Sequence, residues 1–201
     1  SGILNVAKPP SITSRRVVDR VQKLVRPAKA GHAGTLDPLA TGVLIVCIGQ
    51  ATRLIDYVQR MPKTYEATFL LGRTSDTEDV EGAVTELVDP PVPTADQIQA
   101  AAQGFIGTIQ QRPPAYSALK VQGRRAYDMA RAGEDVQLAP RPIEIYGIEM
   151  LGYEYPELRL RMRCGSGTYV RSLGRDLAES LGTGAVMSAL VRTAIGEFRL
   201  E

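Results

Sequence analysis

An unbroken apolar run, VLIVCIG at residues 43–49, constrains the fold of this chain more than any other feature. Its β-branched residues favour a strand, and a strand with apolar side chains on both sides must be covered on both faces. The run is much shorter than the roughly 18 residues needed for a membrane helix. In a chain of 201 residues that is 44% hydrophobic, it predicts a central buried strand in a domain with a sizeable core.

Periodicity along the rest of the chain predicts a mixture of strands and helices. Alternating apolar residues predict a strand at 63–72 and two more within 143–163. Apolar residues at helical spacing, together with capping residues, predict helices at 14–26, directly after 89–93, around 124–132 and at 168–181. Because strands and helices do not alternate regularly, the predicted class is α+β with a mixed sheet.

Charge is distributed in blocks, although the net charge is only +2. Residues 1–32 carry seven Lys/Arg and one acid, residues 74–111 carry seven acids and no Lys/Arg, and residues 159–175 carry five arginines and no acid. This pattern fits either a positive track with acidic flanks on a folded surface or ordinary solvated faces.

The two cysteines, Cys47 and Cys164, stand far apart, and the first lies inside the predicted buried strand. They are predicted to be buried thiols rather than a disulfide, which favours a reducing compartment. With one histidine and two cysteines, a zinc cluster is difficult to build.

The loop HAGTLDPLATG, residues 32–42, precedes the buried strand and carries Asp37 directly before a proline. Pro38 disfavours helix for Asp37, and the nearby glycines allow close approach of a ligand, so we expect the carboxylate on a stiff turn. From this loop alone, Asp37 is either the acceptor of an Asx turn or a functional group. His32, the one histidine of the chain, is either structural or a base, a metal ligand or a stacking ring.

Arg171 lies in the segment CGSGTYVRSLGRDL, residues 164–177, which follows a predicted strand and begins a predicted helix. A nucleotide-cofactor loop is not favoured, because Val170 stands where the dinucleotide fingerprint needs a third glycine. In the first helical turn, the macrodipole disfavours a cation by roughly 0.3–1 kcal/mol. Arg171 therefore either pairs with an anion, such as a phosphate or the carboxylate of Asp37, or is an exposed arginine without a partner.

The segment PPAYSALKVQGRRAY, residues 113–127, interleaves Lys120, Arg124 and Arg125 with tyrosines, among them Tyr127. Lysine and arginine bind phosphates, and aromatic rings stack on unpaired bases. The segment indicates either nucleic-acid binding or a plain solvated helix.

The acidic stretch DTEDVEG, residues 76–82, does not fit a calcium loop. Its glycine is at the wrong position, and no glutamate occupies the twelfth position. Because unpaired carboxylates are mostly solvated, we expect a surface loop here.

Five segments, taken together, resemble one enzyme family. GHAGTLDPLATG closely resembles a motif of the TruB-type pseudouridine synthases, which make pseudouridine 55 in the T arm of tRNA. Further matching segments follow in the expected order along nearly the whole chain: NVAKPPSITS near the start, KTYEA at 63–67, YSALKVQGRRAY at 116–127 and GTYVRSL at 167–173. The first motif is long and specific, so the chain is identified as similar to this family.

The resemblance implies roles for three matching positions. Asp37 would be the catalytic aspartate, which attacks the target nucleotide at the base or the ribose. Arg171 would pair with the Asp37 carboxylate and keep it in place. Tyr65 would stack on the target base and help to remove the proton from C5.

The resemblance also implies a pocket around these residues. Tyr169 and Leu190 would line it, and His32 would help to displace bases as the nucleotide is flipped out. Two positions depart from the family pattern, because Ala7 and Ser11 stand where the family usually shows Asp and Gly. These departures concern the local loop geometry and not the chemistry.

The implied fold is that of the pseudouridine synthases: α+β, with a mixed, largely antiparallel sheet and flanking helices around a central RNA-binding cleft. Residues 1–201 would form the catalytic domain. An RNA-binding insertion at about 113–141 would close over the RNA and present Lys120, Arg124, Arg125 and Tyr127. Family members usually continue beyond RTAIGEF into a small C-terminal PUA-like RNA-binding domain, which we expect to be absent here.

The implied function is the isomerisation of uridine to pseudouridine at position 55 in the T loop of tRNA. We expect a monomeric cytoplasmic enzyme that binds tRNA and no membrane, and that uses no cofactor and no metal. One alternative is an RNA-guided rRNA pseudouridine synthase of the dyskerin-like group, and another is a non-catalytic tRNA-binding or tRNA-folding protein. The insertion favours the stand-alone enzyme, and Asp37 together with Tyr65 and Arg171 favours catalysis.

Overall fold

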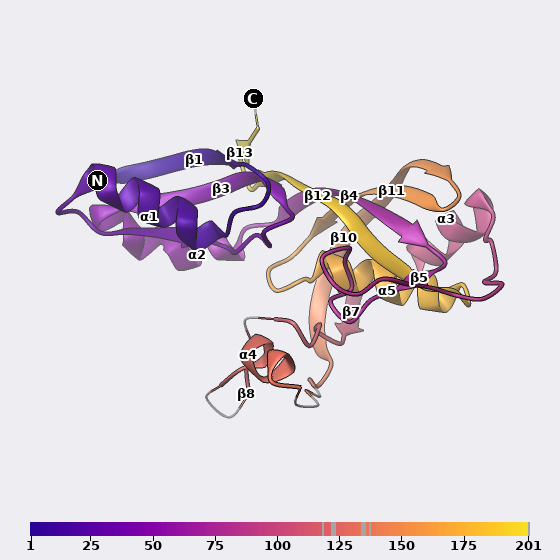
Figure 1. Ribbon diagram of the computed structural model, residues 1–201. Helices are drawn as coiled ribbons and strands as arrows, with labels where there is room; N and C mark the ends of the chain where they lie inside the picture. The colour runs from indigo at the N-terminus through magenta and orange to yellow at the C-terminus, as the bar shows by residue number, and fades with distance from the viewer. Residues whose placement is uncertain (118, 122–123, 134–135, 137, 201) are drawn as a thin grey trace.

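A large mixed sheet forms the body of the protein (Figure 1). The computed structural model describes residues 1–117, 119–121, 124–133, 136 and 138–200. Within these residues the sheet has nine strands in the order β1-β3-β12-β4-β11-β10-β7, with β2 paired to β3 and β13 paired to β12. Its strands are β1 Gly2–Lys8, β2 Ala30–Ala33, β3 Thr41–Ile48, β4 Lys63–Leu71, β7 Gly107–Gln111, β10 Arg141–Glu154, β11 Glu157–Cys164, β12 Ala185–Ile195 and β13 Phe198–Arg199.

The strand pairs are antiparallel except for one. β12 pairs with β3 in parallel, and the other neighbours in this sheet run in opposite directions. The predicted α+β class with a mixed, largely antiparallel sheet is therefore confirmed. Two short hairpins lie outside the sheet: β5 Arg73–Thr74 with β6 Thr85–Glu86, and β8 Lys120–Val121 with β9 Arg124–Arg125.

The helices lie against the sheet, apart from α4 (Figure 1). They are α1 Ser14–Val25, the 3-10 helix η1 Gly49–Leu54, α2 Ile55–Arg60, α3 Ala95–Gln103, α4 Ala126–Arg131 and α5 Val170–Ser180. Their ends follow the sequence signals. Thr13 caps α1 by accepting a hydrogen bond from the Arg16 amide, and Thr94 forms a capping box with Gln97 at the start of α3.

The apolar residues 43–48 form most of the buried strand β3. Its residues 43–47 are fully buried. Alternate side chains enter two separate clusters, one with Val58 of α2 and the other with Val17 and Val18 of α1. The sequence does not alternate in polarity because both faces of this strand are covered.

A larger core lies where β4, β10, β11 and β12 meet α3 and α5. β4 contributes Phe69, β11 contributes Leu160 and α5 contributes Leu173, each about 1–2% exposed. Burial along β4 alternates residue by residue, as its sequence predicts. The face of β4 that holds Phe69 also holds Tyr65, which places a candidate site residue at the edge of this core.

The excursion at 113–141 extends away from the sheet (Figure 1). A short helix was expected around 124–132, and α4 occupies Ala126–Arg131. The helix begins later than expected because Arg124 and Arg125 pair with the strand Lys120–Val121 instead.

Candidate active site

Asp37 lies on the loop between β2 and β3, and this loop is fixed from both sides. Lys8, 1% exposed, donates from Nζ to the carbonyls of Pro38 (3.2 Å) and Ala40 (2.6 Å). Ser14 Oγ accepts from the Leu36 amide (2.8 Å) and donates to the Leu36 carbonyl (3.1 Å). The loop backbone is thus held by buried donors, while the Asp37 side chain keeps 34% exposure and is open to a ligand.

Ser11, at one of the positions that depart from the family pattern, supports the same loop. It adopts a φ of 62°, in the left-handed region that favours glycine, and its amide donates to the Pro38 carbonyl at 2.9 Å. Ser11 therefore adopts the left-handed backbone conformation that a glycine would adopt at lower cost.

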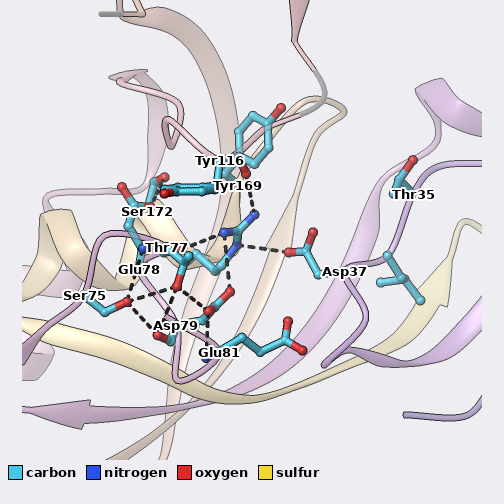
Figure 2. Close-up of polar contacts among 12 residues, drawn as sticks. Thr35, Asp37, Ser75, Thr77, Glu78, Asp79, Glu81, Tyr116, Tyr169 and Ser172 are labelled. Carbon is cyan, nitrogen blue, oxygen red and sulfur yellow. Dashed lines mark hydrogen bonds and ion pairs between the residues drawn. The ribbon is translucent and has the colours of Figure 1, made fainter. Parts of the chain in front are cut away.

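Arg171 is the partner of Asp37 (Figure 2). Its Nε lies 3.0 Å from Asp37 Oδ2, and its side chain is 7% exposed. Its Nη1 lies 3.4 Å from Asp79 Oδ2 and donates to the Thr77 carbonyl at 2.6 Å, while Nη2 donates to the Tyr116 carbonyl at 3.3 Å. Of the partners that the sequence left open for Arg171, the structure shows the carboxylate of Asp37. Arg171 is fixed by several acceptors, so it fixes the carboxylate in turn.

The acidic stretch at 76–82 is a loop that is exposed at Asp76, Val80 and Glu81, as predicted, but it buries Asp79, which the prediction of a surface loop did not include. The Asp79 side chain is 4% exposed, and its Oδ1 accepts from Thr77 Oγ1 (2.6 Å) and from the Glu81 amide (3.0 Å). Its other oxygen faces Arg171 (Figure 2). Burial is tolerated here because the carboxylate has charged and hydrogen-bonding partners.

Glu78, in the same stretch, anchors the loop to α5. It accepts a hydrogen bond from Ser172 Oγ at 2.6 Å and forms an ion pair with Arg175. Burial raises the pKa of Glu78, and the positive charge of Arg175 opposes that rise. Arg171 and Arg175 are four residues apart and share one helix face, so two arginines of α5 hold the acidic loop against the site.

Tyr65 and Leu190 lie on neighbouring strands beside this network. Tyr65 of β4 is 8% exposed and Leu190 of β12 is 6% exposed, and both belong to the main core cluster. Burial raises the pKa of Tyr65, whereas the positive charge of Arg192 opposes that rise. Arg192 was not among the residues that the sequence singled out.

Tyr169 is the N-cap residue of α5, and its backbone is held by one buried side chain. Gln111 donates from Nε2 to the Tyr169 carbonyl (3.0 Å) and accepts from the Tyr169 amide through Oε1 (2.9 Å). The Arg141 guanidinium lies over the Tyr169 ring, 5.2 Å from its centroid. These contacts fix the start of the helix that presents Arg171.

Comparison with known proteins decides the family. Residues 22–170 match the N-terminal domain of the TruB family pseudouridylate synthases. The chain belongs to this family. The chain is 48% identical, over 200 residues, to the tRNA pseudouridine synthase B of Dehalococcoides mccartyi, and covers 67% of that protein. It is 46% identical to the enzyme of the same name from Syntrophus aciditrophicus, and covers 64% of it.

The curated relatives are thus longer, and this chain spans about two thirds of their length. Solved structures agree with the family. The chain superposes over its whole length on half of a chain in a Cbf5-Nop10-Gar1 complex, with a TM-score of 0.77 and 33% identity. A structure of an H/ACA RNP bound to a substrate RNA gives a TM-score of 0.73 and 32% identity. The predicted pseudouridine synthase fold is confirmed.

Within this TruB-family site, His32 stands apart from the charged network. It lies on β2, half-buried, and among the described residues no hydrogen bond or ion pair joins its side chain to Asp37 or Arg171. Its buried Nδ1 has no hydrogen-bond partner there either. Burial and the charge of Arg192 lower the pKa of His32, so its neutral form is favoured.

The candidate RNA-binding residues are described only in part. Arg124 is exposed on β9. The side chains of Lys120, Arg125 and Tyr127 lie outside the described part of the structure, so their predicted contacts stay predictions.

Cys47 and Cys164 are free, buried thiols, as the sequence predicts. Burial raises the pKa of Cys164 to about 11, so it is neutral at ordinary pH. Among the described residues, no group of three or more His, Cys, Asp or Glu side chains is placed to hold a metal ion. No helix in the described part of the chain is both long and apolar enough to span a membrane.

Proposed function

We propose that this chain isomerises uridine to pseudouridine at position 55 in the T loop of tRNA, with Asp37 as the catalytic group. One observation supports this above the others. A partly exposed carboxylate, on a loop held by buried donors, lies 3.0 Å from a buried guanidinium. Such an arrangement holds one carboxylate in a fixed orientation, as a nucleophile or an ion-pairing group requires.

The chemistry is a rearrangement within one nucleotide. The bond from N1 to C1′ breaks, the uracil turns, and C5 forms a bond to C1′ and loses its hydrogen. The nucleotide gains no electrons and no chemical group overall, so the reaction itself requires no coenzyme. Asp37 stabilises the sugar or the base while the two are apart, by a covalent bond or as an ion pair.

The target base must leave its stack before it can react, because its reacting atoms are otherwise enclosed. In the proposed complex Tyr65 stacks on the base and accepts the C5 proton, and Tyr169 and Leu190 line the pocket. Stacking on an aromatic ring returns about 1–3 kcal/mol per base, which offsets part of the cost of flipping. His32 displaces the bases next to the target.

In this proposal the excursion at 113–141 binds the RNA. Lys120, Arg124 and Arg125 bind phosphates, and Tyr127 stacks on a base. The position of the excursion away from the sheet (Figure 1) is compatible with closure over a T stem-loop. We propose that the chain acts in the cytoplasm as a monomer.

A second candidate is an RNA-guided synthase that acts on rRNA. The similarity to a chain of the Cbf5-Nop10-Gar1 complex favours it, at 33% identity. The tRNA enzyme is favoured more strongly, because the curated relatives named tRNA pseudouridine synthase B are 44–48% identical.

One assay separates these candidates. The purified chain is incubated with unmodified tRNA that carries tritium at C5 of its uridines, and released tritium is counted. A tRNA with U55 replaced by C is the control. We expect release from the first RNA and none from the second. Release only after addition of a guide RNA and partner proteins would favour the rRNA enzyme, and tight binding without release would favour the non-catalytic protein.

A further inference from the structure

Arg192 of β12 is a buried charge that forms no ion pair with the residues that the structure describes. The residue is 1% exposed. Its guanidinium donates to backbone carbonyls, from Nε to Val43 at 2.8 Å and from Nη2 to Gly34 at 3.1 Å, while Nη1 lies 3.5 Å from the Thr35 carbonyl. No carboxylate of the described residues lies within ion-pair distance of it. Buried charges are normally paired, so this exception calls for a reason.

The position of Arg192 supplies that reason. It lies directly opposite Tyr65 in the register between β12 and β4. Burial raises the pKa of Tyr65, and the positive charge of Arg192 opposes that rise. A guanidinium can only donate hydrogen bonds and stays charged, so beside Tyr65 it favours an oxygen that accepts. The guanidinium of Arg192 also contacts the carbonyls of Gly34 and Thr35, which lie in the loop that carries Asp37. The side chain of Arg192 therefore links that loop to the position of Tyr65.

The other groups around Tyr65 do not replace this charge. Asp37, from the loop, raises the pKa of Tyr65, as does burial. Cys164, from β11, is neutral because burial raises its pKa to about 11. Lys63, from β4 itself, has a pKa lowered to about 8 by burial and by Arg192. Arg192 is thus the permanent cation that favours a negative charge on the Tyr65 oxygen.

We propose that Arg192 is a positioning residue, which holds the Asp37 loop and the Tyr65 oxygen in one arrangement and stabilises that oxygen as the acceptor of the C5 proton. The inference rests on the proposed function. After C5 has bonded to C1′, the C5–H bond breaks and its electron pair forms the C5=C6 double bond. The electrons of the N1=C6 bond move to N1, which takes a proton from water. The C5 proton passes to the Tyr65 phenolate and leaves a neutral phenol.

The test compares Arg192→Gln, which removes the charge, with Arg192→Lys, which keeps it. Arg159→Gln is the matched control, because Arg159 is an exposed arginine on β11. Single-turnover tritium release is measured between about pH 6 and pH 9. We expect Arg192→Gln to slow release at pH 7 by at least about tenfold and to recover part of the loss at higher pH. Arg192→Lys should keep the wild-type pH profile, and Arg159→Gln the wild-type rate.

A Tyr65→Phe background separates positioning from general support of the fold. If Arg192 acts through the Tyr65 oxygen, Arg192→Gln adds little to the loss that Tyr65→Phe already causes. An equal fractional loss at every pH, or the full loss again in the Tyr65→Phe background, would overturn the proposal.

A readout independent of activity keeps this inference distinct from the proposed function. With 3-fluorotyrosine at position 65, a fluorine NMR titration follows the ionisation of that residue directly. Arg192→Gln should raise its pKa by about one or more, and Arg192→Lys should change it less. An unchanged titration in a folded Arg192→Gln variant overturns the inference. If that variant does not fold, Arg192→Lys is compared with Arg192→Met, which has no charge at this position. A titration midpoint of residue 65 raised as far by Arg192→Lys as by Arg192→Met overturns the inference. A wild-type chain without tritium release overturns the proposed function alone.

Discussion

Gly174→Ala should destabilise the protein, although alanine is the better helix former. Gly174 lies within α5, where the exchange would ordinarily stabilise by about 1 kcal/mol. A Cβ at this position would, however, overlap carbon atoms of the Phe69 ring on β4. Phe69 is 1% exposed and cannot move into open space. Overpacking of this kind costs about 1–3 kcal/mol and occasionally more, so the clash outweighs the gain in helix propensity.

The magnitude follows from the two opposing effects. Because the added Cβ overlaps three carbon atoms of a buried ring, we place the overpacking cost at the upper end, about 2–3 kcal/mol. Less the gain of about 1 kcal/mol in helix propensity, the free energy of unfolding should fall by about 1–2 kcal/mol. The change should also slow catalysis, because α5 carries Arg171 three residues earlier and a displaced helix moves its guanidinium from Asp37. A misplacement of about 1 Å can cost about 10²-fold in rate. Urea denaturation and single-turnover tritium release measure the two effects separately.

Gly147→Ala is the matched control. A Cβ on Gly147, in β10, would meet no atom within 4 Å, and that residue does not have a positive φ. Its free energy of unfolding should stay within about 0.5 kcal/mol of the wild type. A Gly174→Ala variant as stable as Gly147→Ala, with unchanged turnover, would refute the packing of α5 on β4 as described.

Two further predictions concern titration and RNA affinity. Burial lowers the pKa of Lys63 from 10.5 to about 8, so between these pH values the unfolded chain binds a proton that the folded chain does not. The free energy of unfolding of the wild type minus that of Lys63→Met should therefore rise with pH across this window. A difference that does not change with pH would contradict the lowered pKa of Lys63. Lys120→Ala and Arg124→Ala should each weaken tRNA binding and reduce its salt dependence by about one phosphate contact, and unchanged salt slopes in both variants would argue against phosphate binding by this segment.

Local signals in the sequence account for much of the fold. The alternation in β4 and the double-sided apolar character of β3 follow from short-range pattern, and so does the capping box at Thr94. The position of Arg171 against the helix dipole was also informative, because a locally unfavourable residue has a partner elsewhere.

The burial of carboxylates in the acidic loop at 76–82 could not be predicted from local signals. Its composition is that of a solvated turn, and the groups that justify the burial of Asp79 and Glu78 lie more than 90 residues later, on α5. The spacing of Arg171 and Arg175 on one face of a helix was the available signal, since two arginines on a largely buried helix need acceptors.

Arg192 was missed for a similar physical reason. In the sequence it is one arginine in the segment 185–195, where no strand was predicted, and a solvent-facing side chain is the usual outcome for an arginine. Its acceptors are the carbonyl of Gly34, in the loop after β2, and the carbonyl of Val43, in β3, about 150 residues earlier in the chain. The parallel pairing of β12 with β3 brings them together. Long-range pairing of this kind is not encoded in any local window.

The most direct test of the central claim is single-turnover conversion of unmodified tRNA by Asp37→Asn. Asparagine keeps the size of the side chain and removes its charge, and Asp56→Asn, on the exposed first turn of α2, is the matched control. We predict no detectable pseudouridine with Asp37→Asn at a tRNA affinity close to that of the wild type, and normal conversion with Asp56→Asn. Substantial conversion by Asp37→Asn would contradict the account.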